Sequence, residues 1–221
     1  MVYQKEISAI KVKSSIILLG AGGHAKACID VIEQTNLYNI VGLIGIADEV
    51  GKLVLEYSVI GDDKDIDSIL NANMFGLVCL GQIKTAKERI RLFQRIKNLG
   101  KLPSVIVSPH AYVSSSATIR NGTIIMNGVV VNSSAVIGEN CIINSMSLIE
   151  HDVEIGDHCH ISTGVRINGN TKIGNGTFVG SGSVIREGVV IGENCLIGMG
   201  QSVLSDCDDG TILANQKSKA L

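Results

Sequence analysis

From Val113 onward, every sixth residue of this chain is isoleucine or valine, and the run continues without interruption to Ile197. Four residues after each of these anchors stands a small residue, with Gln201 as the exception. Three residues after each anchor, most positions are glycine, asparagine or aspartate, the residue types that tolerate a left-handed backbone. A chain that turns at such regular points, always with a branched side chain facing inwards, is predicted to coil into a parallel β-helix.

Three hexads make one coil of 18 residues, and successive coils stack at strand spacing, about 4.8 Å. Residues that are 18 apart in sequence are therefore predicted to lie one above another. The Ile-Gly pairs that begin at Ile137, Ile155, Ile173 and Ile191 show this period directly.

The first third of the chain has a different pattern. A buried-strand run at Ile16–Leu19 leads into the turn Gly20-Ala21-Gly22-Gly23-His24-Ala25, and a helix is predicted over 26–34. Further strands are predicted at 40–46 and 75–80, a short strand and helix start within 59–67, and an amphipathic helix at 85–99. This βαβ opening predicts a small Rossmann-like unit, in which Gly20, Gly22 and Gly23 either let backbone amides approach a phosphate or only make a tight turn.

Two features of this unit have a functional and a structural interpretation. Asp48 and Glu49, just past the second strand, stand where an acid can bind a ribose or base, or they belong to a solvated loop. The basic residues that crowd the last helix are interpreted as a solvated face; they are Lys84, Lys87, Arg89, Arg91, Arg95 and Lys97.

The formal net charge of -2 argues against nucleic acid as the main partner, because phosphate-backbone binding requires a basic excess. No stretch approaches the roughly 18 apolar residues that span a membrane. The run at Ile16–Leu19 is too short for a signal peptide. We therefore expect a cytoplasmic protein with six reduced cysteines.

The six-residue register sorts the histidines and cysteines of the repeat. Cys141, Cys159 and Cys195 share the inward column of small residues, so we interpret them as packing residues and expect no metal. His158 falls in the turn column and is interpreted as structural.

His151 falls two residues past an anchor, at a corner where side chains leave the prism, with Glu150 and Asp152 beside it. Gly169 lies 18 residues on, one coil above. An imidazole base next to a glycine amide suits acyl transfer, because the base removes a proton from the attacking group while the amide stabilises the carbonyl oxygen. An exposed corner histidine without a chemical role is the alternative, and the repeat taken alone favours it.

The motif Ile149-Glu150-His151-Asp152, followed by Ile155-Gly156-Asp157 and His160-Ile161 and preceded by Asn144, resembles the bacterial sialic acid O-acetyltransferase (NeuD-type) family. That family includes N-acetyltransferases of nucleotide-linked amino sugars. The glycine turn and Lys26, the turn Val59-Ile60-Gly61 and the repeat entry Ser108-Pro109-His110-Ala111 resemble the family as well, so the similarity covers nearly the whole chain.

The resemblance implies a left-handed β-helix that forms a homotrimer, with acetyl-CoA between neighbouring prisms and the sugar nucleotide on the N-terminal domain. It implies that His151 is the general base and that Asp152, or as second choice Glu150, orients it. Asn144 and His160 would line the pocket near the sugar and the acetyl group, and the Gly169 amide would bind the acetyl carbonyl. Substrate contacts would come from Gly20, Gly22, Gly23, His24 and Asp48.

The expected organisation is thus a nucleotide-sugar-binding domain at 1–107, a β-helix acetyltransferase domain at 108–205 and a tail at 206–221. Two departures from the family pattern bear on specificity. Where the family often has a Gly-Phe-x-Asp-Asp type run, this chain reads Gly42-Leu43-Ile44-Gly45-Ile46-Ala47-Asp48-Glu49, which leaves the nucleotide open. Ala214–Lys217 replaces a Gly-x-Pro-Ala-Lys type ending, so different contacts to the far end of CoA are expected.

The function expected is N-acetylation of a nucleotide-linked amino-deoxy sugar in surface polysaccharide biosynthesis. Three alternatives stay open. O-acetylation of a sugar hydroxyl, as in sialic acid, needs the same base. A zinc hydratase needs three converging imidazoles, whereas His151, His158 and His160 occupy hexad positions that point in different directions. A catalytically silent sugar-nucleotide-binding scaffold would keep the glycine turn without acetyl-CoA-dependent activity.

Overall fold

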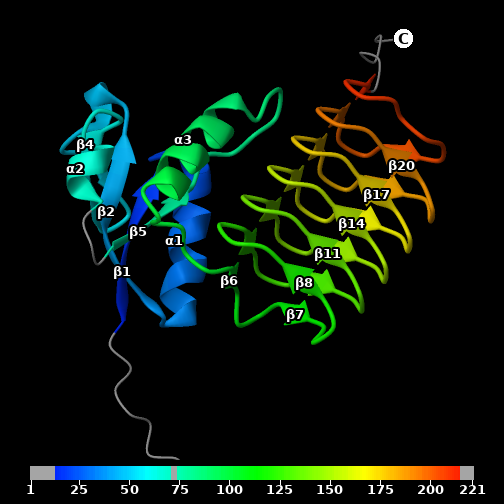
Figure 1. Ribbon diagram of the computed structural model, residues 1–221, viewed down its shortest axis with the longest axis horizontal. Coiled ribbons are helices and arrows are strands. Elements are labelled where there is room, and N and C mark those ends of the chain that lie inside the picture. Colours follow the sequence, from blue (N-terminus) through cyan, green and yellow to red (C-terminus); the bar gives the residue numbers. More distant parts are fainter. Residues whose placement is uncertain (1–12, 71–73, 215–221) are drawn as a thin grey trace, which may run out of the picture.

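The computed structural model describes residues 13–70 and 74–214, so the ends of the expected first and last segments lie outside the described residues. Figure 1 shows a small α/β domain joined to a row of stacked coils that runs away from it. No helix among the described residues is long and apolar enough to cross a membrane.

The N-terminal domain is a five-stranded sheet with the order β3-β4-β2-β1-β5, parallel except for the β3–β4 hairpin. The hairpin is the element that the hydrophobic pattern does not indicate. The elements of the domain are β1 (Ser14–Leu19), α1 (Gly23–Thr35), β2 (Tyr38–Gly45), the 3₁₀ helix η1 (Ala47–Glu49), β3 (Leu53–Val54), β4 (Tyr57–Asp62), α2 (Ile66–Ile69), β5 (Met74–Val78) and α3 (Lys87–Asn98).

Strand β1 is buried on both faces, which explains its continuous apolar run. Ile16 and Leu18 pack into the core that contains α1, while Ile17 and Leu19 pack with α2 and α3 on the other side of the sheet. Helix α1 also contacts the first β-helix strand, so it fills the space between the sheet and the coils.

The rest of the chain forms a three-sided prism of parallel strands two residues long. Face 1 contains β6 (Ile106–Val107), β9 (Ile124–Ile125), β12 (Ile142–Ile143), β15 (His160–Ile161), β18 (Phe178–Val179), β21 (Leu196–Ile197) and β23 (Ile212–Leu213). Face 2 contains β7 (Tyr112–Val113), β10 (Val130–Val131), β13 (Leu148–Ile149), β16 (Arg166–Ile167), β19 (Val184–Ile185) and β22 (Ser202–Val203). Face 3 contains β8 (Thr118–Ile119), β11 (Val136–Ile137), β14 (Glu154–Ile155), β17 (Lys172–Ile173) and β20 (Val190–Ile191).

The predicted register is confirmed. Strands pair at a separation of 18 residues, as Leu148 does with Arg166 and Val130 with Leu148. The turn column has positive φ at every hexad from Gly122 to Gly200, including His158 at 63° and Asp152 at 58°. Cys141, Cys159 and Cys195 are buried free thiols of the inward column.

Two details differ from the sequence expectation. β6 already pairs with β9 and β23 pairs with β21, so the β-helix begins before residue 108 and continues past 205.

The interpretation of the basic helix as a solvated face is wrong for Arg89, which is only 2% exposed. Its guanidinium bridges the two domains and donates hydrogen bonds to the Gln82 side chain and to the carbonyls of Asn140 and His158.

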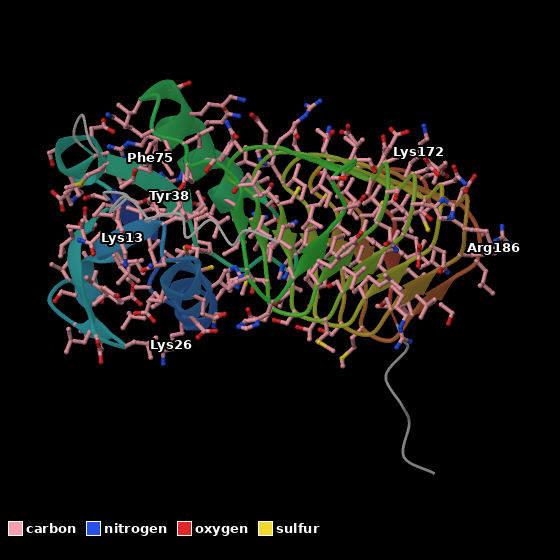
Figure 2. The ribbon with its side chains drawn as sticks, turned by 90° about the horizontal axis from the view of Figure 1, so that it is seen from below. Lys13, Lys26, Tyr38, Phe75, Lys172 and Arg186 are labelled. Atoms are coloured by element: carbon pink, nitrogen blue, oxygen red, sulfur yellow. The ribbon has the colours of Figure 1, made fainter. Side chains whose placement is uncertain are left out.

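The N-terminal domain lies against face 1 and the two corners beside it. The Gln82 side chain donates to the Gly176 carbonyl at 2.8 Å, and the Gln82 backbone carbonyl accepts from His160 Nδ1 at 2.8 Å. The Asn127 side chain donates to the Asp30 carboxylate at 3.2 Å. The corner between faces 2 and 3 lies opposite face 1. In Figure 2, Lys172 and Arg186 of the later coils lie towards the end of the molecule remote from Lys13 and Tyr38.

Candidate active site

His151 occupies the corner between faces 2 and 3, directly after β13. Its Nδ1–H donates to Asp152 Oδ2 at 2.8 Å, and the two side chains are 57% and 53% exposed. A carboxylate at Nδ1 fixes the tautomer in which Nε2 carries the free lone pair. The pair therefore presents a basic nitrogen to the outside of the prism.

Gly169, in the next coil, lies against the His151 ring, as the 18-residue period predicts. A Cβ placed on Gly169 would stand 2.6 Å from His151 Cε1 and 2.8 Å from Nε2, so only glycine leaves room for the imidazole in this position. The Asn170 N–H donates to the His151 carbonyl at 3.1 Å and fixes the two coils in register. Among the residues that the structure describes, the Gly169 N–H has no hydrogen-bond acceptor.

Glu150 is held elsewhere. Its Oε2 accepts a hydrogen bond from Asn132 Nδ2 at 2.9 Å, one coil below. Of the two carboxylates beside His151, the structure thus pairs Asp152 with the imidazole.

The glycine turn of the N-terminal domain lines a cavity of about 350 Å³ at the carboxyl ends of β1, β2 and β5. This is where the strand order reverses, the usual ligand position in open parallel sheets. Gly20 and Gly22 line the cavity; Gly23 begins α1 beside it, and a Cβ on Gly22 or Gly23 would meet nothing within 4 Å. Helix α1 has no side-chain cap and no acid in its first turn, so its N–H groups remain open to an anion.

Family models match both parts of the chain. The PglD N-terminal domain matches residues 15–96, and the six-repeat bacterial transferase hexapeptide model matches 116–151, 134–169 and 170–200. The chain combines these two modules. These matches confirm the expected resemblance in both modules and the expected left-handed β-helix of hexapeptide repeats. A search of curated proteins finds no match.

Solved structures match over nearly the full length. A histidine-to-asparagine variant of perosamine N-acetyltransferase from Caulobacter crescentus, in complex with CoA and GDP-perosamine, is 27% identical, with a TM-score of 0.84 over 92% of this chain and 93% of that one. The acetyltransferase domain of PglB from Neisseria gonorrhoeae, in complex with acetyl-CoA, is 26% identical, with a TM-score of 0.84 over 95% and 100%. WeeI from Acinetobacter baumannii, 19% identical with a TM-score of 0.76 over 94% and 100%, shares the fold. The expected acetyltransferase class is confirmed by the first two matches.

Within one chain of this two-module architecture, the other expected site residues lie away from His151. Asn144 is at the corner between faces 1 and 2, where its Oδ1 accepts from the Ser145 N–H at 2.8 Å. His160 is in face 1 beneath the N-terminal domain and is 7% exposed. Its ring lies 5.3 Å from that of Phe178 and 6.1 Å from that of His24, so the structure brings His24 and His160 together at the domain interface.

Burial lowers the pKa of His160 from 6.5 to about 3, which keeps the ring neutral, and its Nε2 has no partner among the described residues. His24 Nε2 lies 3.4 Å from the Cys28 thiol one helical turn on. The neutral His160 ring and the His24 ring thus form a partly buried pair behind the glycine turn.

Asp48 is exposed on η1 and does not line the cavity, whereas Glu49 does. Sequence reasoning missed Arg91 of α3 and its partners Asp63 and Glu88, which also line the cavity. The Glu88–Arg91 spacing of three residues was the available signal, because residues three apart share a helix face.

A shallower hollow of about 390 Å³ lies on face 3 and contains none of the expected site residues. Within 13–70 and 74–214, no group of three or more His, Cys, Asp and Glu side chains is arranged to hold a metal ion. His151 lies at the corner between faces 2 and 3, His158 at the corner between faces 3 and 1, and His160 in face 1. The three imidazoles therefore do not converge.

Proposed function

We propose that this chain is an acetyl-CoA-dependent N-acetyltransferase that acts on the amino group of a nucleotide-linked amino-deoxy sugar. The observation that carries the proposal is the His151–Asp152 pair seated on Gly169 at an open corner of the β-helix. The relatives that share both modules, and whose structures hold CoA or acetyl-CoA, support it.

In this mechanism, the substrate amine attacks the acetyl carbonyl carbon of the thioester while His151 Nε2 takes the amine proton. Asp152 stabilises the imidazolium that forms, because its carboxylate already accepts the Nδ1–H. The Gly169 N–H, which has no acceptor among the described residues, donates to the oxyanion. The C–S bond then breaks, and the CoA thiolate takes the proton from His151.

We further propose that the active site forms between subunits of a homotrimer. The glycine-turn cavity belongs to a domain that lies on face 1, whereas His151 lies at the opposite corner of the same prism. A sugar nucleotide held in the cavity of one chain is thus directed away from that chain's His151. A neighbouring chain that packs its corner against the first would complete the site, and acetyl-CoA would lie between the two prisms.

The direct test is to incubate the protein with acetyl-CoA and amino-sugar conjugates of uridine, thymidine, guanosine and cytidine diphosphate. Thiol release and an N-acetyl product by mass spectrometry are expected with at least one conjugate. Transfer only to a hydroxyl of free sialic acid would instead make the chain an O-acetyltransferase. Absence of any transfer, despite binding of both substrates, would leave a silent scaffold.

Subunit complementation tests the shared site. His151→Ala removes the base, and Gly22→Asp places a carboxylate at the anion-binding end of α1, where aspartate is a favourable N-cap and the added side chain meets no neighbour. Each variant alone should be inactive. Mixed trimers of the two should regain activity, because some interfaces combine an intact cavity with an intact His151. No recovery in verified mixed trimers would show that each site lies within one chain.

A further inference from the structure

Glu49 is positioned in the cavity by an unusual arrangement at the end of β2. Gly45, the last residue of β2, has no side chain, and a Cβ there would stand 2.6 Å from Glu49 Oε2. The same oxygen accepts the Ile46 N–H at 3.0 Å, which folds the carboxylate back over the strand end. The chain thus delivers an acid to the strand end from η1 instead of from the strand itself.

The end of the second strand is where dinucleotide-binding folds place the acid that binds ribose hydroxyls. Glu49 Oε2 is engaged by the Ile46 N–H, and Oε1 has no partner among residues 13–70 and 74–214. The glycine-turn end of the cavity, at Gly20 and Gly22, adjoins the uncapped N–H groups that begin α1. A nucleotide whose diphosphate lies at the glycine turn would therefore present its ribose towards Glu49.

Arg91 lines the same cavity and is held in a fixed orientation. Its Nε donates to Glu88 Oε2 at 2.9 Å, and Nη2 donates to Asp63. These partners raise the pKa of Arg91, with the Asp63 hydrogen bond as the larger cause. The second terminal nitrogen, Nη1, makes no hydrogen bond within the described part of the chain.

The ion pairs around Arg91 contribute little to stability, because side chains that are half exposed gain at most about 1 kcal/mol from such pairs. Their main effect is to orient the guanidinium. An oriented N–H donor beside carboxylates matches a nucleobase, which carries carbonyl acceptors and N–H donors on one edge. The surroundings of Arg91 do not match a diphosphate, because the carboxylates of Glu49, Asp63 and Glu88 would repel it.

We propose that Glu49 and Arg91 form the nucleoside-binding end of this cavity: Glu49 accepts hydrogen bonds from the ribose hydroxyls, and Arg91 Nη1 donates to a carbonyl oxygen of the base. This assignment rests on the proposed sugar-nucleotide function. It makes a base with a carbonyl group the preferred partner and adenine, which has none, the poorest.

Calorimetric binding of free UDP, GDP, dTDP, CDP and ADP tests the assignment without any transfer step. Glu49→Gln keeps an oxygen for the Ile46 N–H but removes the charge, so the best-bound diphosphate should bind about tenfold more weakly. The analogue of that diphosphate that lacks the ribose hydroxyls should bind the wild type and Glu49→Gln with equal affinity. Asp48→Asn is the matched control, because it removes an exposed acid one residue away that does not line the cavity.

Arg91→Gln should reduce the preference for the best-bound diphosphate over ADP by about tenfold. Lys87→Gln, an exposed charge change on the same helix outside the cavity, should leave the preference unchanged. Unaltered affinity in Glu49→Gln or unaltered base preference in Arg91→Gln would overturn the assignment while leaving the transferase function intact. If none of the five diphosphates binds the wild type, the sugar-nucleotide function itself is contradicted.

Discussion

The imidazole of His151 rests on Gly169 one coil away, at a distance that a methyl group on residue 169 would not allow. Gly169→Ala is therefore expected to push the ring off its seat and away from Asp152. Because misplacement of a catalytic group by about 1 Å can cost 10²-fold, kcat should fall by about 10- to 100-fold. The thermal midpoint should change little, because the displaced ring is largely exposed. In a His151→Ala background the same substitution should have no further effect on kcat, and an additional loss there would mean that Gly169 acts independently of the ring.

Removal of the base itself should separate catalysis from binding. His151→Ala is expected to lower kcat by about 10²- to 10⁴-fold, the usual contribution of a positioned base. The affinity for acetyl-CoA, measured by calorimetry, should be retained. Unchanged turnover would contradict the role of His151.

The two neighbouring carboxylates can be ranked by the same assay. Asp152→Asn preserves a residue that tolerates the positive φ but removes the charge opposite Nδ1. It should reduce kcat more than Glu150→Gln does, because Glu150 bonds Asn132 and not the imidazole. The reverse order would make Glu150 the orienting acid.

Arg89 links the two domains through acceptors that are all neutral oxygens. Burial lowers its pKa to about 10, so it remains charged at neutral pH. Arg89→Met should destabilise the protein by about 2 to 4 kcal/mol, since the buried acceptors lose their donor. Urea unfolding measures this loss. Arg95→Met, which breaks a partly exposed pair with Asp67, should cost under about 1 kcal/mol and serves as the control.

His160 predicts a pH dependence of stability. Its pKa is about 3 in the folded protein against an ordinary value of 6.5, so below pH 6.5 the unfolded chain binds a proton that the folded chain does not. Stability that is intact above pH 6.5 is then lost as the pH falls towards 3, at up to about 1.4 kcal/mol per pH unit. Urea unfolding at pH 7.5 and pH 5 should show a smaller difference in His160→Gln than in the wild type. His158, whose pKa burial also lowers, contributes a remaining slope of the same sign. Equal differences in the two proteins would contradict the assignment.

The fold was predictable because one six-residue column determines it. Each Ile or Val anchor must face inwards and each turn residue must adopt a positive φ, so the register of His151, His158 and Gly169 follows by counting. The β3–β4 hairpin was missed because Leu53 and Val54 make too short a strand to produce an alternating pattern. The boundaries of α1 and α3 shifted by a few residues, since their ends depend on caps that the pattern does not specify.

The candidate site was predictable where it depends on the repeat and not where it depends on contacts between domains. The stacking of His151 on Gly169 follows from the period. The burial of Arg89 does not, because an arginine on a basic helix gives no signal of the polar carbonyls that the β-helix presents to it. The prediction named Asp48 as the substrate contact, whereas Glu49 lines the cavity, for a similar reason. Which of two adjacent acids enters the cavity depends on η1 and on the space left by Gly45.

The three-sided prism also constrains which insertions and deletions a chain of this kind can accept. One hexad advances the backbone by about a third of a turn, so loss of six residues before Ile149 would move His151 to a different corner, facing a different neighbour. Loss of 18 residues would leave it at the same corner and shift it by only about 4.8 Å along the axis. Length changes between the glycine-turn cavity and His151 are therefore expected to be restricted to whole coils.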